Sequence, residues 1–272
     1  MGTPRALRTA AAVDDERREL RSRLRRAGVG RRPGIREEIE IAADDAPPVT
    51  GALDPGADAE VLGESRLPMA IAVVVLMVAA LLAPPRLSIM PGWMLAAIEG
   101  VLLLALILLD PGRIDRTGPW LRRTSIALVA VILASTLAST VLLIFDLVTG
   151  SPLTSEPDLL LAAGAKVWLG NNVAFAFLYW QFDCGGPAVR ARGLPASPDF
   201  AFPQQLNPEV APPDWRPQFL DYLYIGFTNA NAFSPTDTMP MTHWAKVAMG
   251  SQALISFVVV GLVLARAVNA FT

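Results

Sequence analysis

The sequence predicts an all-α, polytopic helical membrane protein with about five transmembrane helices and a short re-entrant half-helix before the last one. Three observations lead to this fold class. Of the 272 residues, 53% are hydrophobic, and the mean hydropathy of +0.42 is higher than soluble domains usually have. Several segments are long and apolar enough to cross a bilayer. Charge is concentrated outside them, because residues 1–65 hold 11 of the 23 basic and 13 of the 25 acidic residues.

The membrane-crossing segments follow from their length and apolar content. A bilayer core of about 30 Å requires about 20 apolar residues in helical form. Pro84 and Pro85 are expected to end the first segment, and Trp93 is expected to anchor the second at the membrane interface. The predicted spans are residues 67–84, 91–109, 124–145, 160–182 and 245–270.

The chain divides into four parts by composition. Residues 1–65 are expected to form a charged, partly disordered cytoplasmic tail, with a short surface helix near 13–27. An alternative for this tail is an arm whose arginines contact anionic lipid. Residues 66–182 form a four-span membrane region, and residues 183–216 are a Pro-rich connecting loop. Residues 217–272 hold the half-helix, a polar turn and the last span.

The distribution of arginine predicts the orientation in the membrane. Residues 110–123 carry Arg113, Arg116, Arg122 and Arg123, whereas residues 146–159 carry acids and no base. Because cytoplasmic loops are enriched in Lys and Arg, the 110–123 loop and the N-terminus are expected in the cytoplasm. The predicted location is therefore the inner (plasma) membrane, as a multi-pass protein with a cytoplasmic N-terminus.

Four polar residues lie inside the predicted spans and are candidate functional residues, because polar groups in hydrocarbon usually face protein or water. Glu99 is either a neutral acid bonded to a neighbouring helix or an ion or proton site. Lys166 lies near the outer end of its span and would pair with Glu99 only if their depths agree. Asn171 and Asn172 lie on a helix whose Asn172 face either packs against another helix or lines a pathway.

A polar stretch before the last span predicts the re-entrant segment. Residues 217–228, "PQFLDYLYIGFT", are apolar but too short to cross a bilayer. We expect a half-helix that stops at the following Asn, Ser and Pro residues. Non-helical backbone at membrane depth requires burial in protein or contact with water. The candidate ion pathway or polar turn comprises Thr228, Asn229, Asn231, Ser234, Thr236 and Asp237.

Two resemblances bear on this part of the chain. The order of half-helix, polar turn and inner helix, with "FT" at 227–228 and "DTMPMTHWAK" at 237–246, resembles the pore module of potassium-type channels. The glycine-containing filter of those channels is missing, because the turn reads "NANAFS" at 229–234, so their mechanism of potassium selectivity is not implied. The predicted sidedness of this loop is also inverted relative to those channels.

The second resemblance covers nearly the whole membrane part. The segments "FAFLYWQFDCGGP" at 175–187, "PDFAFP" at 198–203, "DYLYIGFT" at 221–228 and "SPTDT" at 234–238 resemble a family of bacterial five-span membrane proteins of unknown function. This resemblance implies the fold and the topology and leaves the activity open.

The favoured functional hypothesis is a channel-like protein whose re-entrant segment conducts or binds a cation. The C-terminal dipole end of the half-helix favours cations, monovalent ones being the candidates, and a pore would need a homo-oligomer. The alternative is a non-conducting membrane scaffold or accessory protein. Enzyme activity is not expected, because His243 is the only histidine and Cys184 the only cysteine. No cofactor and no nucleic acid is expected, and the lipid bilayer is the expected partner.

Overall fold

The computed structural model describes residues 63–150, 156–193, 197–212, 215–232 and 237–271. The chain separates into two compact units, Met1–Asp58 and Ala59–Thr272, and the account below concerns the second. The predictions made for the tail up to residue 62, including its surface helix, lie outside the described residues.

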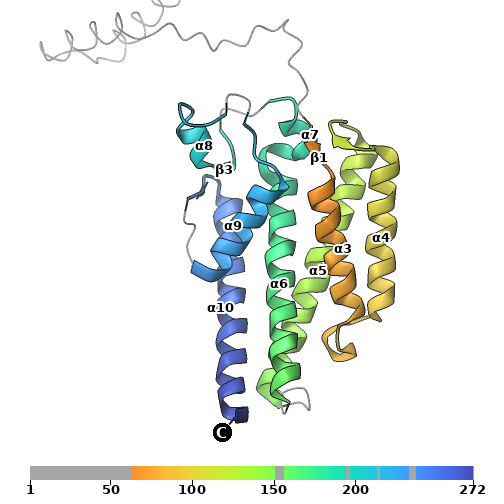
Figure 1. Cartoon of the computed structure of the whole chain (residues 1–272), viewed down its shortest axis with the longest axis vertical. Helices are drawn as coiled ribbons and strands as arrows, with labels where there is room; N and C mark the ends of the chain where they lie inside the picture. Colours follow the sequence, from red (N-terminus) through yellow and green to blue (C-terminus); the bar gives the residue numbers. More distant parts are fainter. Residues whose placement is uncertain (1–62, 151–155, 194–196, 213–214, 233–236, 272) are drawn as a thin grey trace, which may run out of the picture. The chain divides into compact units, whose positions relative to one another are not determined.

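Five apolar helices run alternately up and down in the second unit (Figure 1). They are α3 (Leu67–Leu81), α4 (Gly92–Leu109), α5 (Pro119–Thr149), α6 (Pro157–Phe182) and α10 (His243–Phe271). Four of them, α4, α5, α6 and α10, are long and apolar enough to cross a membrane. The fold is therefore helical with four such helices, and α3 with its 15 residues would extend only about 22 Å.

The helix ends differ from the predicted spans for local reasons. Helix α3 stops at Leu81, three residues earlier than predicted, because Pro84 and Pro85 follow, and residues Pro85–Leu87 form a short 3-10 helix. Helix α5 is longer than predicted at both ends. It begins with Pro119 at its first turn and ends before Gly150, whose φ of 77° is left-handed and suits glycine.

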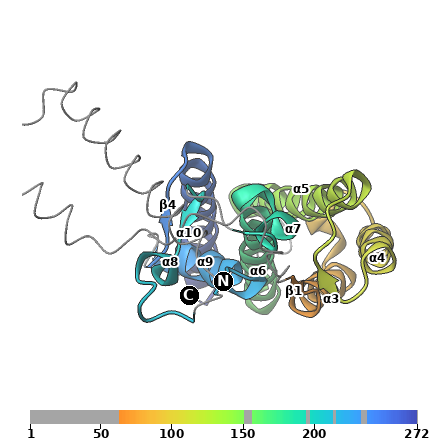
Figure 2. The same ribbon diagram turned by 90° about the horizontal axis from the view of Figure 1, so that it is seen from above.

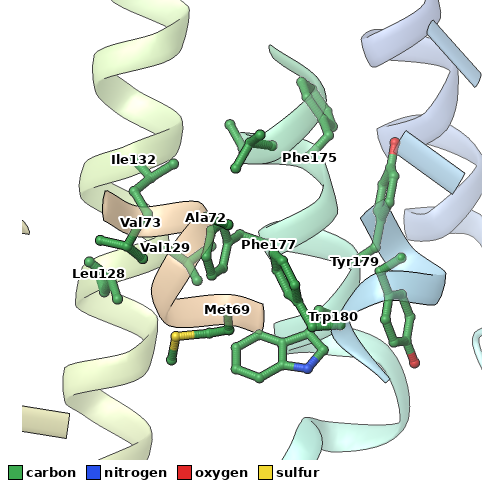
Figure 3. Close-up of a cluster of buried hydrophobic side chains, with 14 of the residues drawn as sticks. Met69, Ala72, Val73, Leu128, Val129, Ile132, Phe175, Phe177, Tyr179 and Trp180 are labelled. Carbon is green, nitrogen blue, oxygen red and sulfur yellow. The ribbon is translucent and has the colours of Figure 1, made fainter. Parts of the chain in front are cut away.

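Helix α6 is the central helix of the unit. Figure 2 shows it between α10 on one side and α3, α4 and α5 on the other. In the most apolar 18-residue stretch of α6, 56% of the residues are buried. The corresponding share is 22% in α4, which lies at the outside. The core on the α3 side contains Met69, Ala72 and Val73 of α3 with Leu128, Val129 and Ile132 of α5, and Phe177 and Trp180 of α6 (Figure 3).

The segments before α3, between α4 and α5, and between α6 and α10 meet at one end of the bundle. Strand β1 (Glu64–Ser65) pairs antiparallel with β2 (Arg113–Ile114). Beside them, the Arg66 guanidinium forms a buried ion pair of 2.8 Å with Asp110. The N-terminal segment and the 110–123 loop, which the arginine distribution predicts on one side of the membrane, therefore lie together.

The predicted connecting loop 183–216 has structure of its own. It contains the 3-10 helix Asp183–Gly185, α7 (Pro187–Arg190), β3 (Phe200–Ala201) and α8 (Pro203–Leu206). Strand β3 pairs with β4 (Met239–Pro240), just before α10. This connection is therefore attached to the start of α10.

Helix α9 (Phe219–Ala232) is the short helix predicted before the last span, and it packs against α6 and α10. The predicted end before residue 229 is wrong, because the helix continues through Ala232. An asparagine side chain can end a helix by hydrogen-bonding to backbone groups in a turn conformation. The amides of Asn229 and Asn231 make other hydrogen bonds, so both residues stay helical. Asn229 bonds to α10, and Asn231 Nδ2 donates to the Phe227 carbonyl 2.9 Å away in the preceding turn.

Gly226 allows α9 to approach α6 closely. A Cβ atom at this position would lie 2.8 Å from the backbone oxygen of Asn172, and a backbone atom cannot rotate away. We predict that Gly226→Ala lowers the free energy of unfolding by about 1–3 kcal/mol. Thermal unfolding of the detergent-solubilised protein would measure this loss.

Gly250 in α10 supplies the matched control, because nothing lies within 4 Å of a Cβ added there. Gly250→Ala should leave stability unchanged or raise it slightly, since alanine favours the helix. Equal effects of the two substitutions would contradict the close approach of α9 and α6 at Gly226.

Candidate functional site

An amide cluster joins α6, α9 and α10 inside the bundle. It comprises Asn171, Tyr179, Asn229, Gln252 and Ser256, all of them buried. Gln252 is its centre. Its Oε1 accepts hydrogen bonds from the Tyr179 hydroxyl at 2.7 Å and from Asn229 Nδ2 at 2.8 Å, and its Nε2 donates to the Gly226 carbonyl at 2.8 Å.

The remaining hydrogen bonds of the amide cluster join α9 to α10 and α6 to α10. Asn229 Nδ2 also donates to the Met249 carbonyl at 2.9 Å, so both of its amide hydrogens are used within the chain. Asn171 Nδ2 donates to Ser256 Oγ at 2.8 Å. Buried polar groups of this kind are costly when unpaired and stabilising when paired. The cluster therefore clamps α9 to its two neighbours.

The structure places the other predicted turn residues differently. The Thr228 hydroxyl donates to the Tyr224 carbonyl of its own helix at 2.9 Å. Asn231 is exposed, and the exposed Asp237 accepts a hydrogen bond of 3.2 Å from the Tyr224 hydroxyl. Ser234 and Thr236 lie outside the described residues. Of the predicted set, only Asn229 belongs to the amide cluster.

Glu99 and Lys166 line one small cavity in the middle of the bundle. Its volume is about 40 Å³, and Ser135, Thr136 and Ser139 of α5 also line it. Glu99 is 1% exposed, and its Oε2 has no hydrogen-bond partner among the described residues. No ion pair joins Glu99 to Lys166 in this part of the chain, although the sequence raised that pairing.

The face of α6 that carries Asn172 packs against other parts of the chain. Asn172 Nδ2 bonds to the Trp168 carbonyl of its own helix at 2.8 Å. Phe175, Ala176 and Tyr179 on the same face are buried against other side chains. This face is therefore part of the protein core in a single chain.

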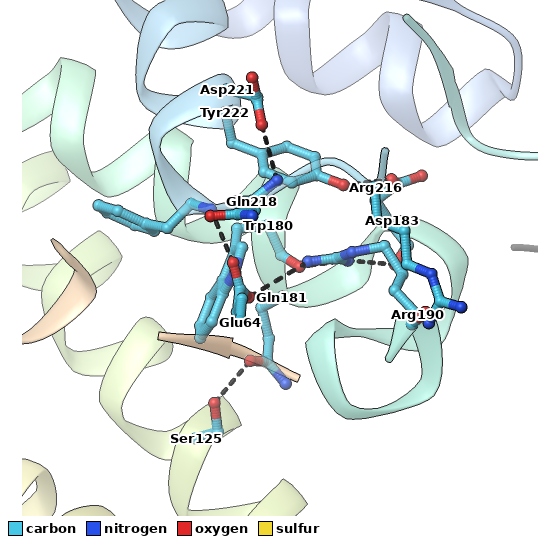
Figure 4. Close-up of polar contacts among 11 residues, drawn as sticks. Glu64, Ser125, Trp180, Gln181, Asp183, Arg190, Arg216, Gln218, Asp221 and Tyr222 are labelled. Atoms are coloured by element: carbon cyan, nitrogen blue, oxygen red, sulfur yellow. Dashed lines mark hydrogen bonds and ion pairs between the residues drawn. The ribbon is translucent and has the colours of Figure 1, made fainter. Parts of the chain in front are cut away.

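A group of charged and polar residues, called the end cluster below, lies where α6 ends (Figure 4). The sequence did not point to it. It comprises Glu64, Asp183, Arg190 and Tyr222. The Glu64 carboxylate accepts hydrogen bonds from the Trp180 indole and, at 2.8 Å, from the Phe219 backbone N–H. It thereby joins the start of α3 to the end of α6 and to the first residue of α9.

Arg190 and Asp183 complete the end cluster. Arg190 Nη1 donates to the carbonyl oxygens of Trp180 and Asp183, at 2.8 and 2.7 Å. The Asp183 carboxylate accepts from the Tyr222 hydroxyl and from two backbone N–H groups next to β3. The Arg190 guanidinium also lies over the Tyr222 ring, 4.9 Å from its centre.

Two larger cavities flank the end cluster and share Pro187. One has a volume of about 290 Å³ and is mostly apolar, with Leu106, Ile114 and Trp180 among its lining residues. The other, of about 350 Å³, is lined by Arg113, Arg190, Arg216 and other residues and is called the arginine cavity below. Among the described residues, no group of three or more His, Cys, Asp or Glu side chains could hold a metal ion.

The sequence alone could have indicated some of the residues in the two clusters, but not others. Gln252 and Ser256 are polar residues in the apolar last span, so the reasoning that selected Asn171 would also have selected them. Glu64, Asp183 and Arg190 lie in hydrophilic segments where charge is expected. Their burial depends on contacts between residues far apart in the sequence.

Comparison of the chain with protein-family models, with curated proteins and with solved structures finds no match. The resemblances to a five-span family and to a channel pore module therefore stay predictions.

We predict that Gln252→Leu destabilises the protein, because it leaves the Asn229 amide, the Tyr179 hydroxyl and the Gly226 carbonyl with fewer partners in a buried site. The free energy of unfolding should fall by about 2–4 kcal/mol. Denaturation of the purified protein would measure it. Ser251→Ala, at the adjacent exposed position, is the control. A Gln252→Leu variant as stable as this control would show that the cluster contributes nothing.

Glu64 should make stability depend on pH. Burial raises the pKa of its carboxyl above 4.5, although Arg190 and the hydrogen bonds from Trp180 and Phe219 oppose the shift. A raised folded-state pKa means that the folded protein binds the proton more tightly, so stability falls as pH rises from 4.5 through the folded-state pKa. Melting temperatures of Glu64→Gln should fall less over this window than those of the unmodified protein.

The control for this pH dependence is Glu209→Gln, because Glu209 is an exposed acid in the connecting segment 183–216. Asp110, whose pKa burial also raises, should leave a residual slope in the same direction in every variant. Identical slopes in the Glu64 and Glu209 variants would contradict the assignment to Glu64.

Proposed function

We propose that the protein is a five-span membrane protein that acts as a non-conducting scaffold, with α9 as a short helix that enters the membrane without crossing it. The length of α9, 14 residues or about 21 Å, supports a helix that stops within the bilayer. Exposed apolar residues on α3, such as Ile71 and Val78, support a fifth crossing whose outer face contacts lipid. The bilayer is then the partner of this outer surface.

One observation carries the scaffold proposal, namely that both amide hydrogens of Asn229 are used by α10. An ion pathway at this position needs polar groups that face water or the ion. Here Asn229 and Gln252 bond to each other and to backbone carbonyls, and Gly226 allows α9 to lie close to α6. Such an arrangement suits a rigid element that holds the polar segment in place.

A cation-conducting or cation-binding homo-oligomer is the second candidate. It is favoured by Asn231 and Asp237, which are exposed on the single chain and lie on either side of residues 233–236. Several copies around an axis would bring these groups together near the C-terminal ends of the α9 helices, where the helix dipole favours cations. Ser234 and Thr236 would belong to the same segment.

The proposed orientation places the end cluster on the cytoplasmic side of the inner membrane. Arg113, Arg116 and Arg122 support this, because they belong to the segment that meets the start of α3 at this end.

Ion flux combined with stability separates the two candidates. We expect no potassium or sodium flux from liposomes that hold the folded protein. Asn229→Leu should lower the free energy of unfolding by about 1–3 kcal/mol, because it removes two buried hydrogen bonds. Asn231→Leu is the matched control, since within the described residues its amide donates to the Phe227 carbonyl of its own helix. Flux that Asn231→Leu abolishes at unchanged stability would contradict the scaffold and establish the cation pathway.

A further inference from the structure

We propose that the arginine cavity binds the phosphate group of an anionic ligand. The cavity has a volume of about 350 Å³ and lies at the end of the bundle. Its charged and polar lining residues are Glu64, Ser65, Arg113, Arg190, Arg216 and Gln218. This inference does not depend on whether the protein conducts ions, because the site shares no residue with the amide cluster or the polar turn.

Arg190 provides the strongest indication of an anion-binding site. Its side chain is 2% exposed, yet its Nε and Nη2 atoms have no hydrogen-bond partner among the described residues. The nearest acid is Glu64, whose Oε1 lies 3.9 Å from Nη2, too far for a hydrogen bond. A buried guanidinium with two unsatisfied nitrogens is costly. An anion in the cavity would supply the acceptors that these nitrogens lack.

The neighbouring residues make the cavity suitable for a multiply charged anion. Among the described residues, the lining contains three arginines and one carboxylate, so positive charge is in excess there. Arg216 Nη1 donates to the backbone carbonyl oxygens of Arg190 and Ala191, which fixes its guanidinium beside the main chain of α7 at the cavity. Arg113 is exposed at β2 and has no ion pair within the described ranges.

Phosphate is the ligand chemistry that fits best. It carries up to two negative charges and several acceptor oxygens, and arginine binds it through paired N–H groups. The same chemistry occurs in two sources, a phospholipid headgroup and a soluble phosphate compound. Both sources are candidates for a cavity at the end of the bundle, beside an apolar cavity of about 290 Å³. The experiment therefore has one arm for each source.

The test measures binding to the full chain in detergent or lipid nanodiscs. One arm titrates inorganic phosphate against chloride at constant ionic strength and follows the melting temperature. The other compares nanodiscs of phosphatidylglycerol and phosphatidylcholine and counts the retained lipid by native mass spectrometry. We expect a saturable effect in at least one arm, and the responding arm identifies the source.

Three variants make the test specific. Arg113→Gln should weaken binding about tenfold or more, because it removes one charge-assisted contact from an exposed position where folding is least affected. Glu64→Gln should strengthen binding several-fold, because it removes the one negative charge of the lining. Arg86→Gln makes the same change as Arg113→Gln in the 3-10 helix Pro85–Leu87, away from the cavity, and should have no effect.

Two results would overturn the proposal. One is the absence of a saturable response in both arms from folded protein. The other is an equal loss in Arg113→Gln and Arg86→Gln, which would show that net charge and not the cavity attracts the anion. Because Glu64→Gln is expected to act in the opposite direction, a general loss of folding cannot imitate the predicted pattern.

Discussion

The rest of the structure depends on the Glu64 carboxylate and the side chains that surround it. Through the Trp180 indole and the Phe219 backbone N–H, this one group connects the start of α3, the end of α6 and the start of α9. Arg190 neutralises part of its charge and simultaneously caps the carbonyl oxygens left free where α6 ends. A charge in such a buried position is tolerated because its partners come from several elements.

The end cluster determines where α9 begins, and the amide cluster determines where it lies along the bundle. Asp183 fixes Tyr222, one turn into α9, and Gln252 accepts from Asn229 two turns later. Between them, Gly226 removes the side chain that would separate α9 from α6. Hydrogen bonds therefore attach the short helix near its start, at its middle and near its C-terminal end. In apolar surroundings these polar groups have few other hydrogen-bond partners.

This attachment separates the two functional proposals in physical terms. A pathway needs polar groups that exchange partners readily, whereas the amide hydrogens of Asn229 and the Gln252 amide have fixed partners within the chain. The groups that remain available, Asn231 and Asp237, lie on the outer surface, where a single chain encloses nothing. A pore would thus be a property of an assembly. The scaffold needs only the contacts that one chain already makes.

By itself, the sequence determined the class of the protein, since apolar segments of membrane length follow directly from composition. It predicted the four long apolar helices, with α5 too short at both ends, and the existence of the short helix α9, because length and proline positions are local properties. It also selected Asn171, as a polar residue in an apolar span, and Asn229, as part of the polar stretch before the last span.

Only the tertiary structure decided which polar groups meet. The end of α9 was predicted too early because the sequence does not reveal that Asn229 has a partner in α10. Glu64 and Arg190, 126 positions apart, appear as ordinary surface charges until folding buries them side by side. The physical reason is that helix length depends on neighbouring residues, whereas the pairing of buried charges and amides depends on the packing of distant segments.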